Sequence, residues 1–166
     1  MKVDKIYFDM DGVLVDFNKG VYELTDYKGE LDKEQKKSDG IWKFIKEIPH
    51  FYFKLEPITE MIELFKIMHQ KYGSKCEILT GLPKPEKGVF TAGEDKIMWV
   101  KKYIGDDVKV NLVMREEKQN YCKNKSCILI DDLAENVIEW RAKGGEGILF
   151  VDAKLTKIAL KNLEIL

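Results

Sequence analysis

The chain has 166 residues, of which 45% are hydrophobic and 34% are charged, so we expect one globular domain with at most a small insertion. Its 28 Lys and Arg residues stand against 29 Asp and Glu residues, and this balance argues against a nucleic-acid polymer as the partner. No stretch reaches the roughly 18 apolar residues of a membrane span, and the N-terminus lacks the unbroken apolar segment of a secretory signal, so a cytoplasmic protein without membrane contact is expected.

The first predicted element is a strand over Val3–Phe8, a run of β-branched, aromatic and other apolar residues. It ends at Asp9, with Asp11 two residues later and Gly12 directly after. A buried strand of this kind delivers its carboxylates to its C-terminal edge, where the glycine relaxes the backbone for a turn.

Residues 17–56 follow this strand and have neither a clear strand pattern nor a clear helix pattern. Their centre, Glu30 to Lys37, is rich in Lys and Glu, and aromatic residues flank it on both sides. We interpret the segment as a small, mainly helical cap that is too short to bury its own core. The predicted domain division is therefore 1–16 and 57–166 for the core and 17–56 for a cap over the sheet edge.

The remaining chain alternates helices and strands. Helical periodicity predicts helices over Ile58–Tyr72, Glu94–Ile104 and Leu133–Lys143. Apolar runs predict further strands at Glu77–Leu79, Val108–Met114, Cys127–Ile130 and Gly147–Val151. This alternation indicates an α/β fold with a parallel sheet that is covered by helices on both faces. Such sheets bind ligands beyond the carboxyl ends of their strands.

Polar residues follow several of these strands. A carboxylate such as Asp9 can attack phosphorus only if the phosphoryl charge is neutralised, and a second carboxylate such as Asp11 can handle protons. Thr80 and the amide of Gly81 could hold phosphoryl oxygens, and Lys118 could supply the ammonium group. Asp131 and Asp132 would add oxygen ligands for a metal.

Other metal chemistries fit the sequence poorly. The three cysteines, Cys76, Cys122 and Cys127, form no CxxC pair, and His50 and His69 are the only histidines. The metal is therefore expected to be bound by oxygen, as Mg²⁺ is. Each polar residue also has an ordinary explanation as a turn, a cap or solvated surface. The functional interpretation depends on their occurrence at successive strand ends.

The ordered motifs resemble those of the haloacid dehalogenase superfamily. They are Asp9-Met10-Asp11-Gly12-Val13-Leu14, Ile78-Leu79-Thr80-Gly81, Lys118, and Ile128-Leu129-Ile130-Asp131-Asp132. More narrowly, the chain resembles the 5'(3')-deoxyribonucleotidase branch and its bacterial and phage relatives. That likeness includes Asp16-Phe17, Trp42, Phe51 and Lys96-x-x-Trp99-Val100.

The resemblance implies a Rossmann-like core, a cap inserted after the first strand, and specific roles. Asp9 would be the nucleophile and a Mg²⁺ ligand, and Asp11 would be the general acid and then base, with its backbone carbonyl on the metal. Thr80 and Lys118 would bind phosphate. Asp131 and Asp132 would complete the metal site, with Asp132 favoured as the direct ligand and Asp131 left open.

Two departures from that branch leave alternatives open. Gly81 stands where the mammalian enzymes carry a serine, which leaves only a backbone donor there. The stretch between Lys118 and Asp131 is longer than in those enzymes, so Lys123 or Lys125 could be the phosphate lysine instead.

The substrate is expected to be a small phosphorylated molecule. Phe17, Trp42 and Phe51 recur near the ends of the insertion, where they could stack on a nucleotide base or simply fasten the cap. We therefore expect a magnesium-dependent phosphomonoesterase that acts on (deoxy)nucleoside monophosphates. The alternatives are a phosphatase of another metabolite, a transferase with an acceptor other than water, and a non-catalytic phosphate-binding protein.

Overall fold

A central parallel sheet organises the molecule. The computed structural model describes residues 2–32 and 40–166, and within them five parallel strands form one sheet in the order β3-β2-β1-β4-β5. The strands are β1 (Lys5–Phe8), β2 (Cys76–Gly81), β3 (Val110–Val113), β4 (Cys127–Asp131) and β5 (Glu146–Leu149). In the central strand, Ile6 is paired with Cys76 on one side and with Ile128 on the other. Each strand begins and ends within two residues of its predicted run, so the predicted α/β class is confirmed.

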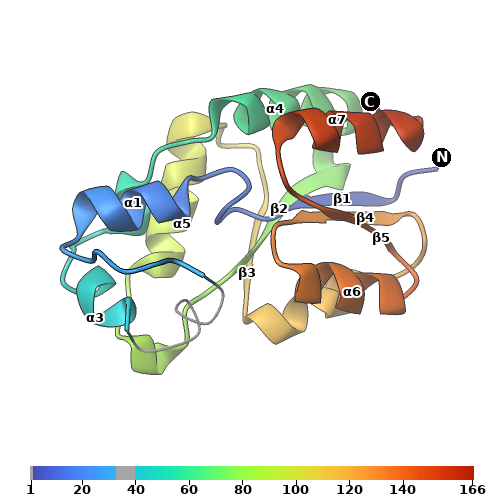
Figure 1. Ribbon diagram of the computed structural model, residues 1–166. Coiled ribbons are helices and arrows are strands. Elements are labelled where there is room, and N and C mark those ends of the chain that lie inside the picture. Colours follow the sequence, from blue (N-terminus) through green and yellow to red (C-terminus); the bar gives the residue numbers. More distant parts are fainter. Residues whose placement is uncertain (1, 33–39) are drawn as a thin grey trace.

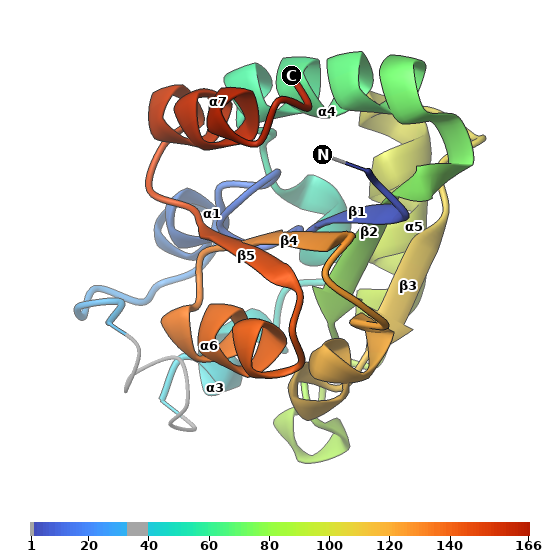
Figure 2. The ribbon, with the colours of Figure 1, turned by 90° about the vertical axis from the view of Figure 1, so that its right-hand side faces the viewer.

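Helices cover both faces of the sheet. The α-helices of the core are α4 (Thr59–Tyr72), α5 (Ala92–Tyr103), α6 (Ala134–Ala142) and α7 (Ala153–Asn162). Short 3-10 helices occupy η2 (Gly73–Lys75), η3 (Pro85–Lys87) and η4 (Arg115–Tyr121). Helices α4 and α7 lie over one face and α6 lies over the other (Figures 1 and 2). None of the helices in residues 2–32 and 40–166 combines the length and apolarity that crossing a membrane requires.

Strand alternation divides the apolar core between the two faces. Ile6 and Phe8 belong to a large cluster that includes residues of α4, and the rings of Phe8 and Phe65 meet edge to face with centroids 5.0 Å apart. Tyr7 points the other way into a smaller cluster with Trp140 of α6. Because successive side chains of a strand point to opposite faces, β1 is buried on both sides and is held firmly where it delivers Asp9.

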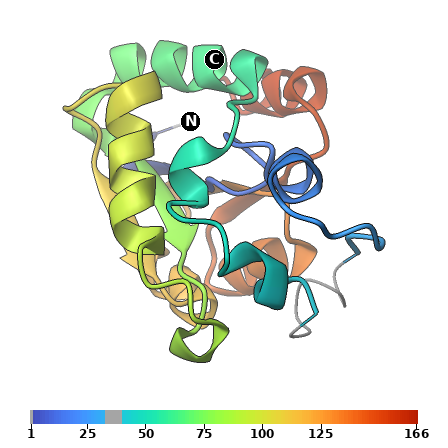
Figure 3. The same cartoon turned by 90° about the vertical axis from the view of Figure 1, so that its left-hand side faces the viewer.

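The inserted segment lies at the carboxyl edge of the sheet. It contains α1 (Phe17–Leu24), α3 (Trp42–Ile45) and the 3-10 helix η1 (Tyr52–Lys54). Figure 3 looks onto this edge and shows α1 in blue and the teal segment that leads into α4 in front of the sheet. Most of the charged centre predicted at residues 30–37 falls in 33–39, outside the described residues.

The two ends of the insertion meet beside the first strand. The amide of Asp16 donates to the carbonyl of Glu56 at 2.9 Å, and the amide of Ile58 donates to the carbonyl of Leu14 at 2.8 Å. Apolar residues of the insertion, including Val21, Ile45 and Phe51, are buried in the same cluster as the core. The segment therefore shares the hydrophobic core of the sheet.

Contacts with α5 fix the return of the insertion toward the core. The Nδ1 atom of His50 lies 2.7 Å from Oδ1 of the buried Asp95, and the indole of Trp99 donates to the carbonyl of Leu55 at 2.7 Å. These two contacts bracket η1 and place the ring of Tyr52 over Lys96, with the ammonium nitrogen 4.6 Å from the ring centroid.

Candidate active site

A cavity of about 520 Å³ opens at the carboxyl edge of the sheet, between the core and the inserted segment. Its lining combines carboxylates, cations and aromatic rings from five parts of the chain. The described residues that line it are Asp9, Asp11, Phe17, Leu31, Asp32, Trp42, Tyr52, Gly81, Leu82, Pro83, Arg115, Lys118, Asp132, Leu133 and Asn136. Most of the residues singled out from the sequence therefore meet at one place.

Asp9 faces a buried lysine. Lys118 lies on η4, and its ammonium group is 2.8 Å from Oδ1 of Asp9 and 2.8 Å from Oδ2 of Asp131. Burial and then the charge of Asp131 raise the pKa of Asp9 well above its usual value, against the opposing effect of Lys118. Burial lowers the pKa of Lys118, but Asp9 and Asp131 outweigh it and leave that pKa above the ordinary lysine value. Lys118 is therefore a cation held between two carboxylates.

The alternative lysines lie elsewhere. Lys123 and Lys125 are exposed, and the ammonium group of Lys123 donates to the backbone carbonyl of Asn120. Neither is among the described residues that line the cavity. Of the three candidates from the sequence, Lys118 is the one that the fold brings to Asp9.

The acidic pair after β4 divides into a buried and a cavity-lining member. Asp131 is fully buried, and its oxygens accept from Lys118, from the amide of Leu133 and from the side chain of Asn136. Asp132 lines the cavity instead. It lies against Gly12, where an added Cβ would be 2.3 Å from Oδ2 of Asp132 and where φ is +79°. This turn requires glycine both for its conformation and for the close approach of the carboxylate.

Three carboxylates could hold a metal ion here. Asp9, Asp131 and Asp132 each offer an oxygen, and these oxygens all lie within 4.8 Å of one another. An all-oxygen, anionic donor set of this kind suits a hard divalent cation such as Mg²⁺ better than a soft one. The residues present therefore fit the metal that the sequence led us to expect.

A second buried lysine contacts Asp11. Lys96 of α5 is fully buried, and its ammonium group donates to Oδ2 of Asp11 at 2.7 Å, to the hydroxyl of Thr80 at 2.8 Å and to the carbonyl of Gly81 at 2.7 Å. Thr80 is also fully buried, so its hydroxyl lies behind the cavity wall that Gly81 forms. The pKa of Tyr52, whose ring lies over Lys96, is raised well above its usual value, chiefly by burial and then by Asp11.

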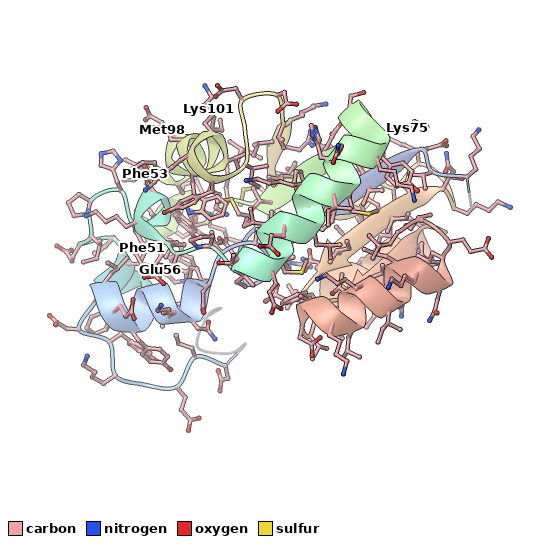
Figure 4. The ribbon with its side chains drawn as sticks, turned by 90° about the horizontal axis from the view of Figure 1, so that it is seen from above. Phe51, Phe53, Glu56, Lys75, Met98 and Lys101 are labelled. Atoms are coloured by element: carbon pink, nitrogen blue, oxygen red, sulfur yellow. The ribbon has the colours of Figure 1, made fainter. Side chains whose placement is uncertain are left out.

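The aromatic residues of the insertion take two different places. Phe17 and Trp42 line the cavity, with ring centroids 6.5 Å apart. Phe51 is fully buried and is absent from the described lining residues. It meets Phe17 edge to face with centroids 5.8 Å apart, and it lies between α1 and α5 when the molecule is seen from above (Figure 4). Phe51 therefore packs behind Phe17, and its direct contact with a substrate stays a prediction.

Several residues at the site were given no role from the sequence, although Lys96 was part of the family resemblance. Arg115 lines the cavity and donates to Oδ1 of Asn136 at 3.1 Å and to Glu139 at 3.3 Å. Asn136 in turn holds Asp131. Tyr52 also lines the cavity, and Lys96 lies directly behind it. For Lys96 a signal was present, because it shares one helix face with the apolar Trp99 and Val100 at i+3 and i+4.

The comparisons with known proteins agree with this geometry. A model of the family described as "5' nucleotidase, deoxy (Pyrimidine), cytosolic type C protein" matches residues 2–159. The chain is 30% identical over 142 residues to a protein of Vibrio phage KVP40 assigned as a 5'(3')-deoxyribonucleotidase, with 81% of this chain and 71% of the phage protein covered.

A mammalian relative and a solved structure extend these comparisons. Identity to the human mitochondrial 5'(3')-deoxyribonucleotidase is 29% over 150 residues, covering 77% of this chain and 61% of the human protein. The chain thus spans about three fifths of the length of that relative. The crystal structure of a hydrolase from Streptococcus pneumoniae TIGR4 superposes with a TM-score of 0.55 at 14% identity, covering 97% of this chain and 100% of the hydrolase chain, which supports the fold.

The motif order, the cavity and the family match now point the same way. The resemblance to the nucleotidase branch of the haloacid dehalogenase superfamily is confirmed by a family match over nearly the whole chain. The names of the relatives place them among phosphoric monoester hydrolases. The chain belongs to this 5'-nucleotidase family and is a phosphoric monoester hydrolase by class.

Proposed function

We propose that the chain is a magnesium-dependent 5'-nucleotidase that acts on (deoxy)nucleoside monophosphates through an aspartyl-phosphate on Asp9. One observation carries the proposal: Asp9 and Asp11 face the same cavity, and Lys118 lies 2.8 Å from Asp9, in a chain that matches the family over residues 2–159. A carboxylate nucleophile, a proton donor and a cation for the phosphoryl charge are thereby within reach of one substrate.

The reaction would proceed in two displacements. A carboxylate oxygen of Asp9 attacks phosphorus, the bond from phosphorus to the ester oxygen breaks, and Asp11 gives its proton to the departing alkoxide. Asp11 then takes a proton from water, whose oxygen attacks phosphorus, and the bond between phosphorus and Asp9 breaks. Lys118 lies where it can neutralise phosphoryl oxygens, and Gly81, which lines the same cavity, would offer its backbone amide.

The metal site would use the carboxylates of Asp9, Asp131 and Asp132. Asp132 is favoured as a direct ligand because it lines the cavity, whereas Asp131 is buried and already accepts hydrogen bonds from Lys118 and Asn136. A bound Mg²⁺ supplies charge neutralisation for the phosphoryl group that the carboxylate attacks.

The inserted segment, residues 17–56, would act as a cap that selects the leaving group. Phe17, Trp42 and Tyr52 give the cavity aromatic walls, and base stacking on such rings favours a nucleotide over a sugar phosphate. The cytoplasmic location stays a prediction, and the human and mouse relatives are named as mitochondrial.

A turnover screen tests the proposal. The purified protein is assayed with Mg²⁺ against ribo- and deoxyribonucleoside 5'-monophosphates, sugar phosphates and p-nitrophenyl phosphate. We expect the highest kcat/KM for a pyrimidine deoxynucleoside monophosphate. A sugar phosphate that outranks every nucleotide would overturn the substrate class, and no phosphate release from any ester would overturn the reaction.

A further inference from the structure

The buried Lys96 has no place in the chemistry described above. We infer that Lys96 is a positioning residue for proton transfer: by binding one oxygen of Asp11 it holds this carboxylate in a fixed orientation at the cavity. This inference rests on the proposed role of Asp11 as general acid and adds a residue of α5 to the machinery.

The contacts of Lys96 define a rigid socket. Its three donor hydrogens have three acceptors, namely Oδ2 of Asp11, Oγ1 of Thr80 and the carbonyl of Gly81, at 2.7, 2.8 and 2.7 Å. The ring of Tyr52 closes the remaining side, 4.6 Å from the ammonium nitrogen. An ammonium group has three N–H donors and no acceptor, so this arrangement uses all of its hydrogen-bonding capacity.

The two oxygens of Asp11 are not equivalent. Oδ2 accepts from Lys96, whereas Oδ1 is buried and has no hydrogen-bond partner among residues 2–32 and 40–166. Asp11 nevertheless lines the cavity. A buried carboxylate oxygen without a donor is costly. Among the described residues, the carboxylate is therefore held through Oδ2, and Lys96 is the side chain that holds it.

Lys96 itself is placed behind the reacting groups. Its side chain is fully buried, and it is absent from the described residues that line the cavity, whereas Lys118 is among them. Lys96 therefore acts on the substrate through Asp11 and leaves the phosphoryl group to Lys118. Because helix α5 is anchored to the insertion through Asp95 and Trp99, the orientation of the acid is also linked to the seating of the cap.

The test uses Lys96→Met and a series of aryl phosphates from p-nitrophenyl phosphate to phenyl phosphate, together with the nucleotide. A leaving group that needs no proton gains least from a general acid, and such catalysis is worth about 10²–10⁴-fold for one that does. We expect kcat to fall by about 10–100-fold for phenyl phosphate and the nucleotide, and by less than about threefold for p-nitrophenyl phosphate. KM and the inhibition constant of inorganic phosphate should change by less than about threefold.

The double variant Asp11→Asn/Lys96→Met supplies a second measurement that contains no unpaired buried charge. Its activity should match that of Asp11→Asn within about threefold, because two groups that act as one unit are not additive. Lys101→Met is the matched control, since Lys101 lies on the same helix and is exposed (Figure 4), and it should behave as wild type.

Three outcomes would overturn the inference. Equal losses on all leaving groups would make Lys96 a structural residue, and a raised inhibition constant for phosphate would make it a phosphate ligand. A further large loss in the double variant would show that it acts independently of Asp11. A wild-type enzyme that hydrolyses aryl phosphates but no nucleotide would defeat the proposed substrate, yet the aryl series would still decide the role of Lys96.

Discussion

Two buried lysines, Lys118 and Lys96, contact Asp9 and Asp11, the two carboxylates proposed as catalytic. Lys118 reaches Asp9 at 2.8 Å and lines the cavity, with Asp131 as a second anionic partner. Lys96 reaches Asp11 at 2.7 Å, is fully buried, and has neutral second and third partners in Thr80 and Gly81. The pairs have nearly equal lengths but different surroundings.

This difference teaches that a short lysine–carboxylate contact does not by itself define a role. Lys118 lies between two carboxylates, so it can neutralise a third anion only if one of these carboxylates binds a metal or becomes phosphorylated. The cation with one carboxylate and two neutral acceptors is already balanced. Lys118 is thus suited to meet a phosphoryl group, and Lys96 is suited to hold a side chain still.

The largest effect is expected for Asp9→Asn, which removes the carboxylate that Lys118 contacts. An amide does not attack phosphorus and is a poor metal ligand, so kcat/KM should fall by more than about 10⁴-fold on every substrate, whatever its leaving group. The measurement is phosphate release from the nucleotide and from p-nitrophenyl phosphate. Activity within tenfold of wild type would rule out Asp9 as the nucleophile.

Metal removal should abolish turnover through the carboxylates that surround Lys118. Because the donors are carboxylate oxygens, EDTA should abolish turnover and Mg²⁺ should restore it, while Ca²⁺ should bind and turn over poorly because it tolerates looser coordination. Full activity in excess EDTA contradicts the metal assignment. Calorimetric titration of Mg²⁺ into wild type and into Asp132→Asn then measures how much Asp132 contributes to Mg²⁺ affinity, without an activity assay.

Asp11→Asn tests the partner of Lys96, because its effect on the rate should differ between substrates with good and poor leaving groups. The rate for the nucleotide should fall by about 10²–10⁴-fold, and the rate for p-nitrophenyl phosphate should fall much less, because p-nitrophenolate leaves without a proton. Steady-state kinetics on both substrates provide the measurement. Equal losses would show that Asp11 is not the general acid.

Lys118→Met tests the buried charge cluster through stability. Its removal leaves Asp9 and Asp131 buried without their cation, so the free energy of unfolding of the metal-free protein should fall by about 3–5 kcal/mol. Denaturant titration in EDTA measures this change. Lys123→Met, at an exposed position, is the control and should change stability by less than about 0.5 kcal/mol. A loss below about 1 kcal/mol for Lys118→Met would mean that the cluster is not held by this lysine.

The smallest expected effect concerns the aromatic wall. Trp42→Ala should raise KM for a pyrimidine deoxynucleoside monophosphate by about 5–150-fold, which corresponds to about 1–3 kcal/mol of stacking. Hydrolysis of p-nitrophenyl phosphate should change little. Phe44→Ala is the control, because Phe44 shares helix α3 but contacts Tyr27. Equal losses of activity on both substrates would show that Trp42 holds the inserted segment in place and does not contact the base.

The sheet could be predicted well from the sequence, because apolar runs that end in polar residues are a local signal. Helix α7 was not predicted. Its exposed face carries Leu155 and Ile158, while its buried side includes Thr156. The signal for that helix lay in Asp152, which caps it by accepting from the amide of Leu155.

The site could be predicted only in part, because motifs show which residues react and not which residues hold them. Asp9, Asp11 and Lys118 follow from strand ends and ordered motifs. The partners of Asp11 do not, since Lys96 reaches it from a helix 85 positions later in the chain. Likewise, Phe17 and Phe51 look alike in sequence, and only packing decides that one lines the cavity while the other is buried behind it.

The position of β1 in the centre of the sheet has a consequence for biosynthesis. In the order of synthesis this strand precedes its two neighbours in the sheet, residues 76–78 and 127–130. At about 5–20 residues per second, β1 waits roughly 6–24 s for β4 to be made. Pairings of such separation form slowly, and the unpaired backbone edges of β1 stay open to other chains in the meantime. Because Asp131 at the end of β4 is the second anionic partner of Lys118, the charge cluster around Asp9 is complete only after β4 has been made.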